Sequence, residues 1–264
     1  MKSPSTQSWQ TEGLAPMGRP SASMRVLMAI VGYVERLNLR YAKHGNPCVY
    51  DIEAFPWAAG IEREWRAVRD ELDRVMVRKS ELPNVQDITA DAVSITRDEN
   101  WKIFPLIAYG IRSQPNIDMC PHTWRLVRRI PGLTTAMFSI LEPGKHIPPH
   151  RGPYNGVLRL HLGVLVPQTG ERLAIRVGSE EYRWQEGRVL IFDDAYEHEV
   201  WNETKHVRVV LFVDFAKPLR FPANILNRLL LTLSVFTPFL REGSVNLRRW
   251  EQRFHGDPAR RIRA

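Results

Sequence analysis

Five side chains able to bind a metal or an anion lie in the second half of this 264-residue chain: His150, Arg159, His161, His198 and Arg208. Neutral imidazole is the commonest protein ligand of first-row transition metals. A guanidinium inside an apolar segment is costly unless it meets an anion. Each residue alone would predict only a surface or core side chain. Together they predict a metal site next to a pocket for a small dianion.

Short apolar runs predict the strands that carry these residues. Six runs end in turn residues and are listed here: Ala136–Leu141, Val157–Val166, Leu173–Val177, Tyr182–Trp184, Arg188–Phe192 and Val207–Phe215. Alternation places Arg159 and His161 on one face of their strand and leucines on the other. His150 and His198 are expected in connections between strands. Six strands without a helical period predict a mainly β fold with flanking helices, of jelly-roll type.

The residues before this β-region predict helices and loops. Residues 1–23 are polar and rich in Ser and Pro, which predicts a disordered leader. An amphipathic helix is expected within 24–46, either packed on the domain or lying on a membrane surface. Residues 57–79 repeat apolar side chains at helical steps, which predicts one helix. The polar segment 82–101 is expected to be a flexible loop.

The charge balance points to an acidic partner, because the formal net charge is +8 and the isoelectric point is near 9.8. Residues 219–264 predict a basic helical segment and tail, in which 224–240 is a helix lying on a surface. The tail from 241 is expected to be either a solvated end or an anchor at an anionic membrane. Two cysteines, Cys48 and Cys120, indicate a reducing compartment. A cytoplasmic location, with peripheral contact to the inner face of a membrane as an option, is therefore expected.

Two long strings carry a family resemblance: FSILEPGKHIPPHRGPYNGVLRLHLGV, from Phe138, and GRVLIFDDAYEHEVWNET, from Gly187. They resemble the aspartyl/asparaginyl β-hydroxylase family, and the segments from about Tyr50 resemble its bacterial members. The resemblance implies iron(II)- and 2-oxoglutarate-dependent oxygenases built on a double-stranded β-helix, a cupin-like jelly roll. The segment LRFPANILNRLL, which begins at Leu219, is similar to the lipid A acyl-chain hydroxylases of the same family.

The resemblance also implies a site: iron held by His150 and His198, and 2-oxoglutarate held by Ser139, Arg159, His161 and Arg208. Ser139 and Arg208 would bind the far carboxylate of the keto acid, and a guanidinium is its natural partner. Arg159 and His161 would lie at the end that chelates the metal. Iron(II), 2-oxoglutarate and O₂ are the implied cofactors and co-substrates, and His146 is the first alternative ligand. No further catalytic residue is implied.

One departure from the usual site lies at Gly152. Most enzymes of this chemistry bind iron through two His and one carboxylate, and the acid would stand at this position. The peptide aspartyl hydroxylases also lack the acid, whereas the lipid A hydroxylases carry it. The glycine therefore favours the former over the latter, and it leaves room for a halide and for halogenation.

The resulting functional prediction is hydroxylation of an unactivated C–H bond in an Asp/Asn-like or peptidyl substrate. One alternative is hydroxylation of a lipid A acyl chain at the inner membrane surface. The other is a metal-binding jelly-roll module without turnover. The oxygenase domain is predicted to span 47–218, with its β core at about 133–218. No nucleic-acid partner is expected, and no oligomeric state is predicted.

Overall fold

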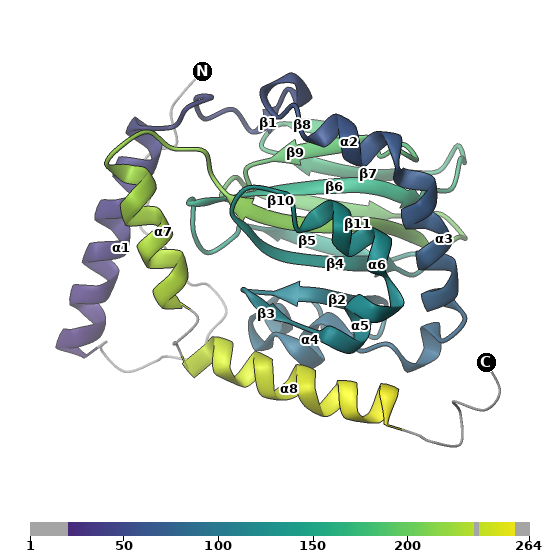
Figure 1. Ribbon diagram of the computed structural model, residues 1–264. Helices are drawn as coiled ribbons and strands as arrows, with labels where there is room; N and C mark the ends of the chain where they lie inside the picture. The colour runs from purple at the N-terminus through teal and green to yellow at the C-terminus, as the bar shows by residue number, and fades with distance from the viewer. Residues whose placement is uncertain (1–20, 235–237, 257–264) are drawn as a thin grey trace.

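Two antiparallel β-sheets form the centre of the computed structural model, which describes residues 21–234 and 238–256 (Figure 1). The larger sheet has seven strands in the order β1-β9-β6-β11-β4-β2-β3. Their bounds are β1 Val49–Tyr50, β9 Val189–Phe192, β6 Val157–Leu165, β11 Arg208–Ala216, β4 Leu133–Leu141, β2 Trp101–Ala108 and β3 Ile111–Arg112. The smaller sheet has the order β5-β10-β7-β8, with β5 His146–His150, β10 His198–Asn202, β7 Leu173–Val177 and β8 Glu180–Tyr182.

The two sheets share one hydrophobic core, as a double-stranded β-helix requires. Leu160 and Leu211 from the larger sheet and Ile175 and Val200 from the smaller one belong to the same buried cluster. Strand β11 lies at the centre and pairs with β4 on one side and β6 on the other. The predicted fold class, mainly β with flanking helices in a jelly roll, is confirmed.

Short helices cover the larger sheet on its outer face (Figure 1). They are α2 Ala58–Arg63, α3 Trp65–Met76, α4 Val85–Ile88, α5 Gln114–Met119 and α6 Pro121–Val127. The single helix expected over 57–79 is wrong. It breaks at Glu64, whose φ of −100° and ψ of 13° lie outside the α-helical range. Each half still buries its own apolar side, Ile61 in α2 and Leu72 in α3.

The flexible loop expected over 82–101 is also wrong. The segment contains α4 and a short 3₁₀ turn, and it buries Val85 and Ile88. Helix α8, Pro238–His255, packs beside it and buries Trp250 and Phe254, and the Trp250 indole donates a hydrogen bond to the Glu81 carbonyl at 3.0 Å. The stretch 242–256 therefore packs on the domain and is not a solvated end, whereas the rest of the predicted tail, 257–264, lies outside the described residues. The sequence of 82–101 did not predict this structure, because its apolar residues are separated by polar ones and show neither a helical nor a strand period.

Two helices stand together at one side of the β-sheets: α1, Ala22–Arg40, and α7, Ala223–Ser234 (Figure 1). They lie around a small apolar cluster of their own, formed by Ala42, Leu219 and Ala223. The helix predicted within 24–46 is thus present, while most of the predicted leader lies outside the described residues. None of the helices over 21–234 and 238–256 is long and apolar enough to cross a membrane.

Candidate active site

His150 and His198 face each other across neighbouring strands of the smaller sheet. They are direct register partners of β5 and β10, and their ring centroids are 4.1 Å apart. The expectation that both histidines lie in connecting loops is wrong. Pro148 and Pro149 made the segment read as a loop, but β5 is the edge strand of its sheet, where proline is tolerated because no ladder hydrogen bond is lost.

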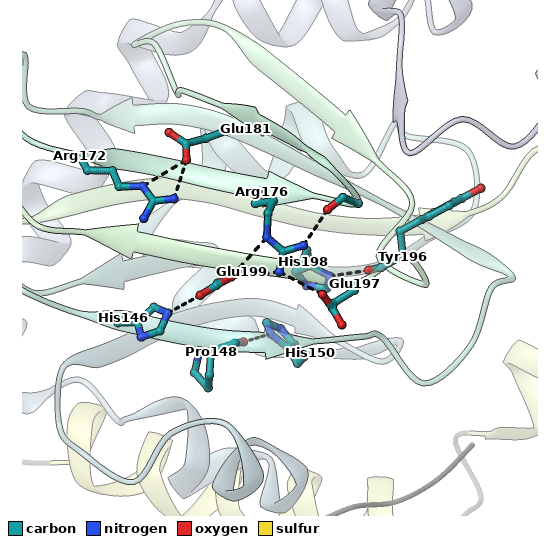
Figure 2. Close-up of polar contacts among 11 residues, drawn as sticks. His146, Pro148, His150, Arg172, Arg176, Glu181, Tyr196, Glu197, His198 and Glu199 are labelled. Atoms are coloured by element: carbon teal, nitrogen blue, oxygen red, sulfur yellow. Dashed lines mark hydrogen bonds and ion pairs between the residues drawn. The ribbon is translucent and has the colours of Figure 1, made fainter. Parts of the chain in front are cut away.

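Both rings are held in the same tautomer. His150 Nδ1 lies 2.8 Å from the Pro148 carbonyl, and His198 Nδ1 lies 3.0 Å from the Tyr196 carbonyl (Figure 2). A carbonyl only accepts, so each Nδ1 carries the proton and each Nε2 keeps its lone pair. Burial lowers the pKa of His150 to about 4 and that of His198 well below its usual value. Two neutral rings with free Nε2 atoms are what a metal needs.

Arg208 is a buried cation without a carboxylate partner in the described part of the chain. It begins β11 and is 2% exposed, and the hydrogen bond that its guanidinium makes there is a 3.5 Å contact from Nη1 to the Ser139 carbonyl. Its Nε has no hydrogen-bond partner among the described residues. Burial alone lowers the pKa of Arg208 to about 9, so the guanidinium stays charged near neutral pH. Trp184 offers its ring face 4.3 Å away, which offsets only a small part of the cost.

Two further buried donors lie close to this cation. Ser139, on β4, accepts a hydrogen bond from the Trp101 indole at 3.0 Å, and its own hydroxyl proton remains to be donated. His161, on β6, accepts from the Trp184 indole at 3.3 Å through Nδ1. The His161 proton therefore lies on Nε2, a buried donor without a partner in the described part of the chain. Ser139, His161 and Arg208 are thus three buried hydrogen-bond donors close to one another.

Arg159 has a different environment from the one expected. It is ion-paired on both sides, with Nη2 2.8 Å from Asp194 Oδ2 and Nε 2.8 Å from Asp214 Oδ1. Asp214 is its register partner on β11, and the ring of Phe212 lies 4.2 Å from the guanidinium carbon. The two carboxylates raise the pKa of Arg159 further. Arg159 is therefore a neutralised cation between strands, unlike Arg208.

Asp194 occupies the space where a side chain at position 152 would lie. The Gly152 amide donates to the Asp194 carbonyl at 2.7 Å, and a Cβ on Gly152 would collide with the carboxylate of Asp194. Asp194 itself is 1% exposed, and burial raises its pKa despite the nearby Arg159. A carboxylate cannot enter at 152 while Asp194 stays in place. Gly152 is thus closely packed against Asp194, which explains why no larger residue stands at this position.

His146, the alternative ligand, lies on a solvent-exposed face. Its Nε2 is 2.8 Å from Glu199, and Arg176 joins the same carboxylate at 3.0 Å (Figure 2). His146 also stacks on Trp201, with centroids 5.7 Å apart. Among residues 21–234 and 238–256, no group of three or more His, Cys, Asp or Glu side chains has a metal-site arrangement. The His150–His198 pair remains the best-placed metal ligand set.

Three residues of this region were missed by sequence reasoning: Trp184, Asp194 and Asp214. Asp214 could have been found, since it shares the strand parity of Arg208 on β11. Trp184 follows a strand that ends two residues earlier than expected, at Tyr182. Asp194 was visible only as one of several acids before His198. Its role depends on contact with Gly152, which is far away in the chain.

The residues present fit a metal with a dianionic ligand. The two Nε2 lone pairs supply metal ligands, and the unpaired Arg208 with its neighbours supplies the charge and donors that a distal carboxylate requires. A buried guanidinium left without an anion is costly, so an anionic ligand is the simplest reason for its presence. The assignment of these residues to iron and 2-oxoglutarate stays a prediction.

The fold is a jelly roll, and comparison with known proteins gives the family. The model of the family described as aspartyl/asparaginyl β-hydroxylase matches residues 62–218. The chain belongs to this family.

A relative from Rhizobium tropici, an ornithine lipid ester-linked acyl 2-hydroxylase, is 57% identical over 95% of this chain and 89% of its own length. The human aspartyl/asparaginyl β-hydroxylase is 36% identical over 64% of this chain, but only 24% of that protein is covered. Among solved structures, a Pseudomonas putida prolyl-4-hydroxylase is 14% identical, with a TM-score of 0.39 over 61% of this chain and 98% of its own. That structural likeness is too partial to add to the assignment.

Proposed function

We propose that this chain is an iron(II)- and 2-oxoglutarate-dependent hydroxylase that adds one oxygen atom to the acyl chain of an ornithine-containing membrane lipid. The observation that supports the cofactor requirement is the buried Arg208, which has no carboxylate partner among the described residues and lies, like His198, close to His161. The similarity to the R. tropici lipid hydroxylase, along nearly the full length of both chains, supports the lipid substrate.

The roles of the chain's own residues follow from their positions. His150 and His198 would hold iron(II) through Nε2, and their Nδ1–carbonyl hydrogen bonds fix the direction of both rings. Arg208 and Ser139 would bind the far carboxylate of 2-oxoglutarate, and His161 Nε2–H would donate to the same molecule. Bound iron(II) and 2-oxoglutarate would supply the chemistry in which O₂ yields succinate, carbon dioxide and a hydroxylated C–H bond.

Arg159 would act with Asp194 rather than as a free cation at the keto acid. Its two ion pairs tie β6, β11 and the turn before β10 together next to His198. Asp194 has an unpaired, buried Oδ1, so one carboxylate oxygen remains to accept from whatever occupies the metal side of the site. The pair would thus orient the site and keep it dry.

The lipid now takes precedence over the Asp/Asn-like substrate that the sequence favoured. The sequence argument against a lipid substrate was that position 152 lacks the acid found in lipid A hydroxylases. In this chain the carboxylate of Asp194 lies where a side chain at position 152 would lie, so the glycine no longer argues against a lipid. A peptide substrate remains the second candidate, because the human relative that is 36% identical is named for Asp/Asn hydroxylation. A cytoplasmic location, with peripheral contact to the inner face of a membrane, belongs to the same proposal. Binding of metal without turnover would leave Arg208 unexplained.

The test supplies purified protein with iron(II), ascorbate, 2-oxoglutarate and, in separate reactions, an ornithine lipid in detergent or an Asp-containing peptide. We expect succinate formation to rise with the lipid, and the lipid to gain one oxygen by mass spectrometry. His150→Ala should abolish both, while His146→Ala, a histidine on the exposed face, should keep them. Turnover with the peptide alone would refute the lipid assignment. Turnover in His150→Ala would refute the ligand assignment.

A further inference from the structure

Helices α1 and α7 expose an apolar surface that no other element within 21–234 and 238–256 covers. Ten large apolar side chains there are between 48% and 72% exposed: Met24, Val26, Leu27, Met28, Ile30, Tyr33, Phe221, Ile225, Leu229 and Leu233. On α7 they form a stripe at four-residue steps, Ile225–Leu229–Leu233, along one side of the helix. The two helices lie side by side at the edge of the molecule (Figure 1), and we call these exposed side chains together the α1–α7 face.

A surface of this kind marks an interaction site, because monomeric soluble proteins rarely leave so many large apolar side chains exposed together. The rest of the fold does not need these side chains. Leu37 of α1 and Ala223 of α7 pack in the separate cluster with Ala42 and Leu219, and the described side chains in the first turns of α1 are exposed. Packing among the described residues therefore does not explain why these exposed side chains are apolar.

The charges around the face indicate what covers it. Residues 21–43 and 218–234 carry six basic side chains, Arg25, Arg36, Arg40, Lys43, Arg220 and Arg228, and one acidic side chain, Glu35. Glu35 is turned to the domain, where its carboxylate accepts from the Asn155 amide at 3.4 Å. A second copy of the chain would bring these like charges together. An anionic bilayer offers both an apolar interior and opposite charge.

The same helices are connected to the loop that follows His150. The Asn38 amide on α1 donates to the Tyr154 hydroxyl at 3.0 Å, and this hydroxyl donates to Asn227 on α7 at 2.6 Å. Asn227 in turn donates to the Gly156 carbonyl at 2.8 Å. This polar network holds both helices against Tyr154–Gly156, in the loop that follows His150 in the chain.

We propose that the α1–α7 face is the surface on which this enzyme docks onto an anionic lipid bilayer, with both helices lying in the interface. The proposal rests on the proposed lipid hydroxylation and deepens it, since docking there places the loop after His150 next to the source of the acyl chain. The apolar stripe inserts among the acyl chains, and the surrounding arginines contact the headgroups.

The test measures co-sedimentation of the full chain with vesicles of phosphatidylcholine alone and of phosphatidylcholine mixed with phosphatidylglycerol. We expect binding to the mixed vesicles, weaker binding to the neutral ones, and a decrease with added salt. Ile225→Glu combined with Leu229→Glu should weaken binding at least tenfold, because two apolar anchors become charged. Val77→Glu, at an 84% exposed apolar residue on α3's C-terminal side, is the matched control and should bind like the wild type.

Three results would overturn the proposal. One is no binding of the wild type to either vesicle, and another is equal binding by the double variant with an unchanged melting temperature. The third is a wild-type dimer in light scattering that the double variant splits, without vesicle binding, since the face would then join two copies. Failure of the proposed function is distinguished by the detergent assay, which needs no docking. If the protein binds vesicles but does not hydroxylate the lipid in detergent, the docking surface is supported and the proposed lipid hydroxylase activity is refuted.

Discussion

Replacing Arg208 with methionine should stabilise the ligand-free protein. In the structure Arg208 is 2% exposed, and burial lowers the pKa of its guanidinium from the ordinary value to about 9. A shift of this size corresponds to about 5 kcal/mol of unfavourable free energy for keeping the charge in place. Methionine fills a similar volume without charge. Some of the gain is lost with the Trp184 contact, so we expect a net stabilisation of about 2–4 kcal/mol.

The same substitution should remove the response to 2-oxoglutarate. At a 2-oxoglutarate concentration a hundredfold above Kd, the free energy of unfolding of the wild type should rise by about 2.7 kcal/mol. For a chain of this size, 1 kcal/mol raises the melting temperature by about 2–4 °C. We therefore expect differential scanning fluorimetry with iron(II) and 2-oxoglutarate, without O₂, to shift wild-type Tm by about 5–10 °C. Arg208→Met should start higher and shift little.

Arg176→Met is the matched control, because this strand arginine already has carboxylate partners on the exposed face (Figure 2). It should lose at most about 1 kcal/mol of stability and keep the 2-oxoglutarate shift. Pyruvate, which lacks the distal carboxylate, should shift the wild type less than 2-oxoglutarate does. The reasoning is refuted if Arg208→Met lowers the stability of the ligand-free protein or retains the full ligand shift.

Three further predictions concern the surroundings of the site. Burial lowers the pKa of His150 to about 4, so between pH 6.5 and 4 the unfolded chain binds a proton that the folded chain does not. His150 should therefore reduce the free energy of unfolding of the metal-free protein by about 3 kcal/mol over this range. Urea unfolding of the wild type and of His150→Asn at several pH values measures this, and the same dependence of unfolding free energy on pH in both proteins would contradict it. Gly152→Ala should destabilise by about 1–3 kcal/mol through collision with Asp194, and no loss by chemical denaturation would show that the turn yields. Tyr154→Phe should lower the free energy of unfolding by about 1–3 kcal/mol and increase hydrogen exchange in α1 and α7. Unchanged exchange would show that these hydrogen bonds do not hold the two helices in place.

The fold could be predicted because its strands are short, apolar and closely spaced. The runs around Phe138, Leu160 and Leu211 each became a central strand of the larger sheet. Strands β5 and β10 were missed for physical reasons. Prolines occupy β5, which sits at an edge, and acids precede β10, so both looked like loops until their partners were known.

The candidate site was predictable in its residue types and not in its electrostatics. Parity along β6 placed Arg159 and His161 on one face, as observed. It could not show that Arg159 is neutralised by Asp194 and Asp214 while Arg208 is left unpaired. Those differences depend on which strands neighbour each other, which a single sequence does not reveal. The same holds for Asp194 beside Gly152.

The most direct measurement of the central claim compares lipids from cells that carry the intact gene, lack it, or carry it with His150→Ala. Lipid mass spectrometry should find ornithine lipids with one added oxygen in an acyl chain only with the intact gene, and growth under isotopically labelled O₂ should label that oxygen. Arg176→Met should restore the modified lipid as the wild type does. Unchanged ornithine lipids in all of these cells, or a full signal from His150→Ala, would contradict an oxygenase that acts on these lipids through this histidine.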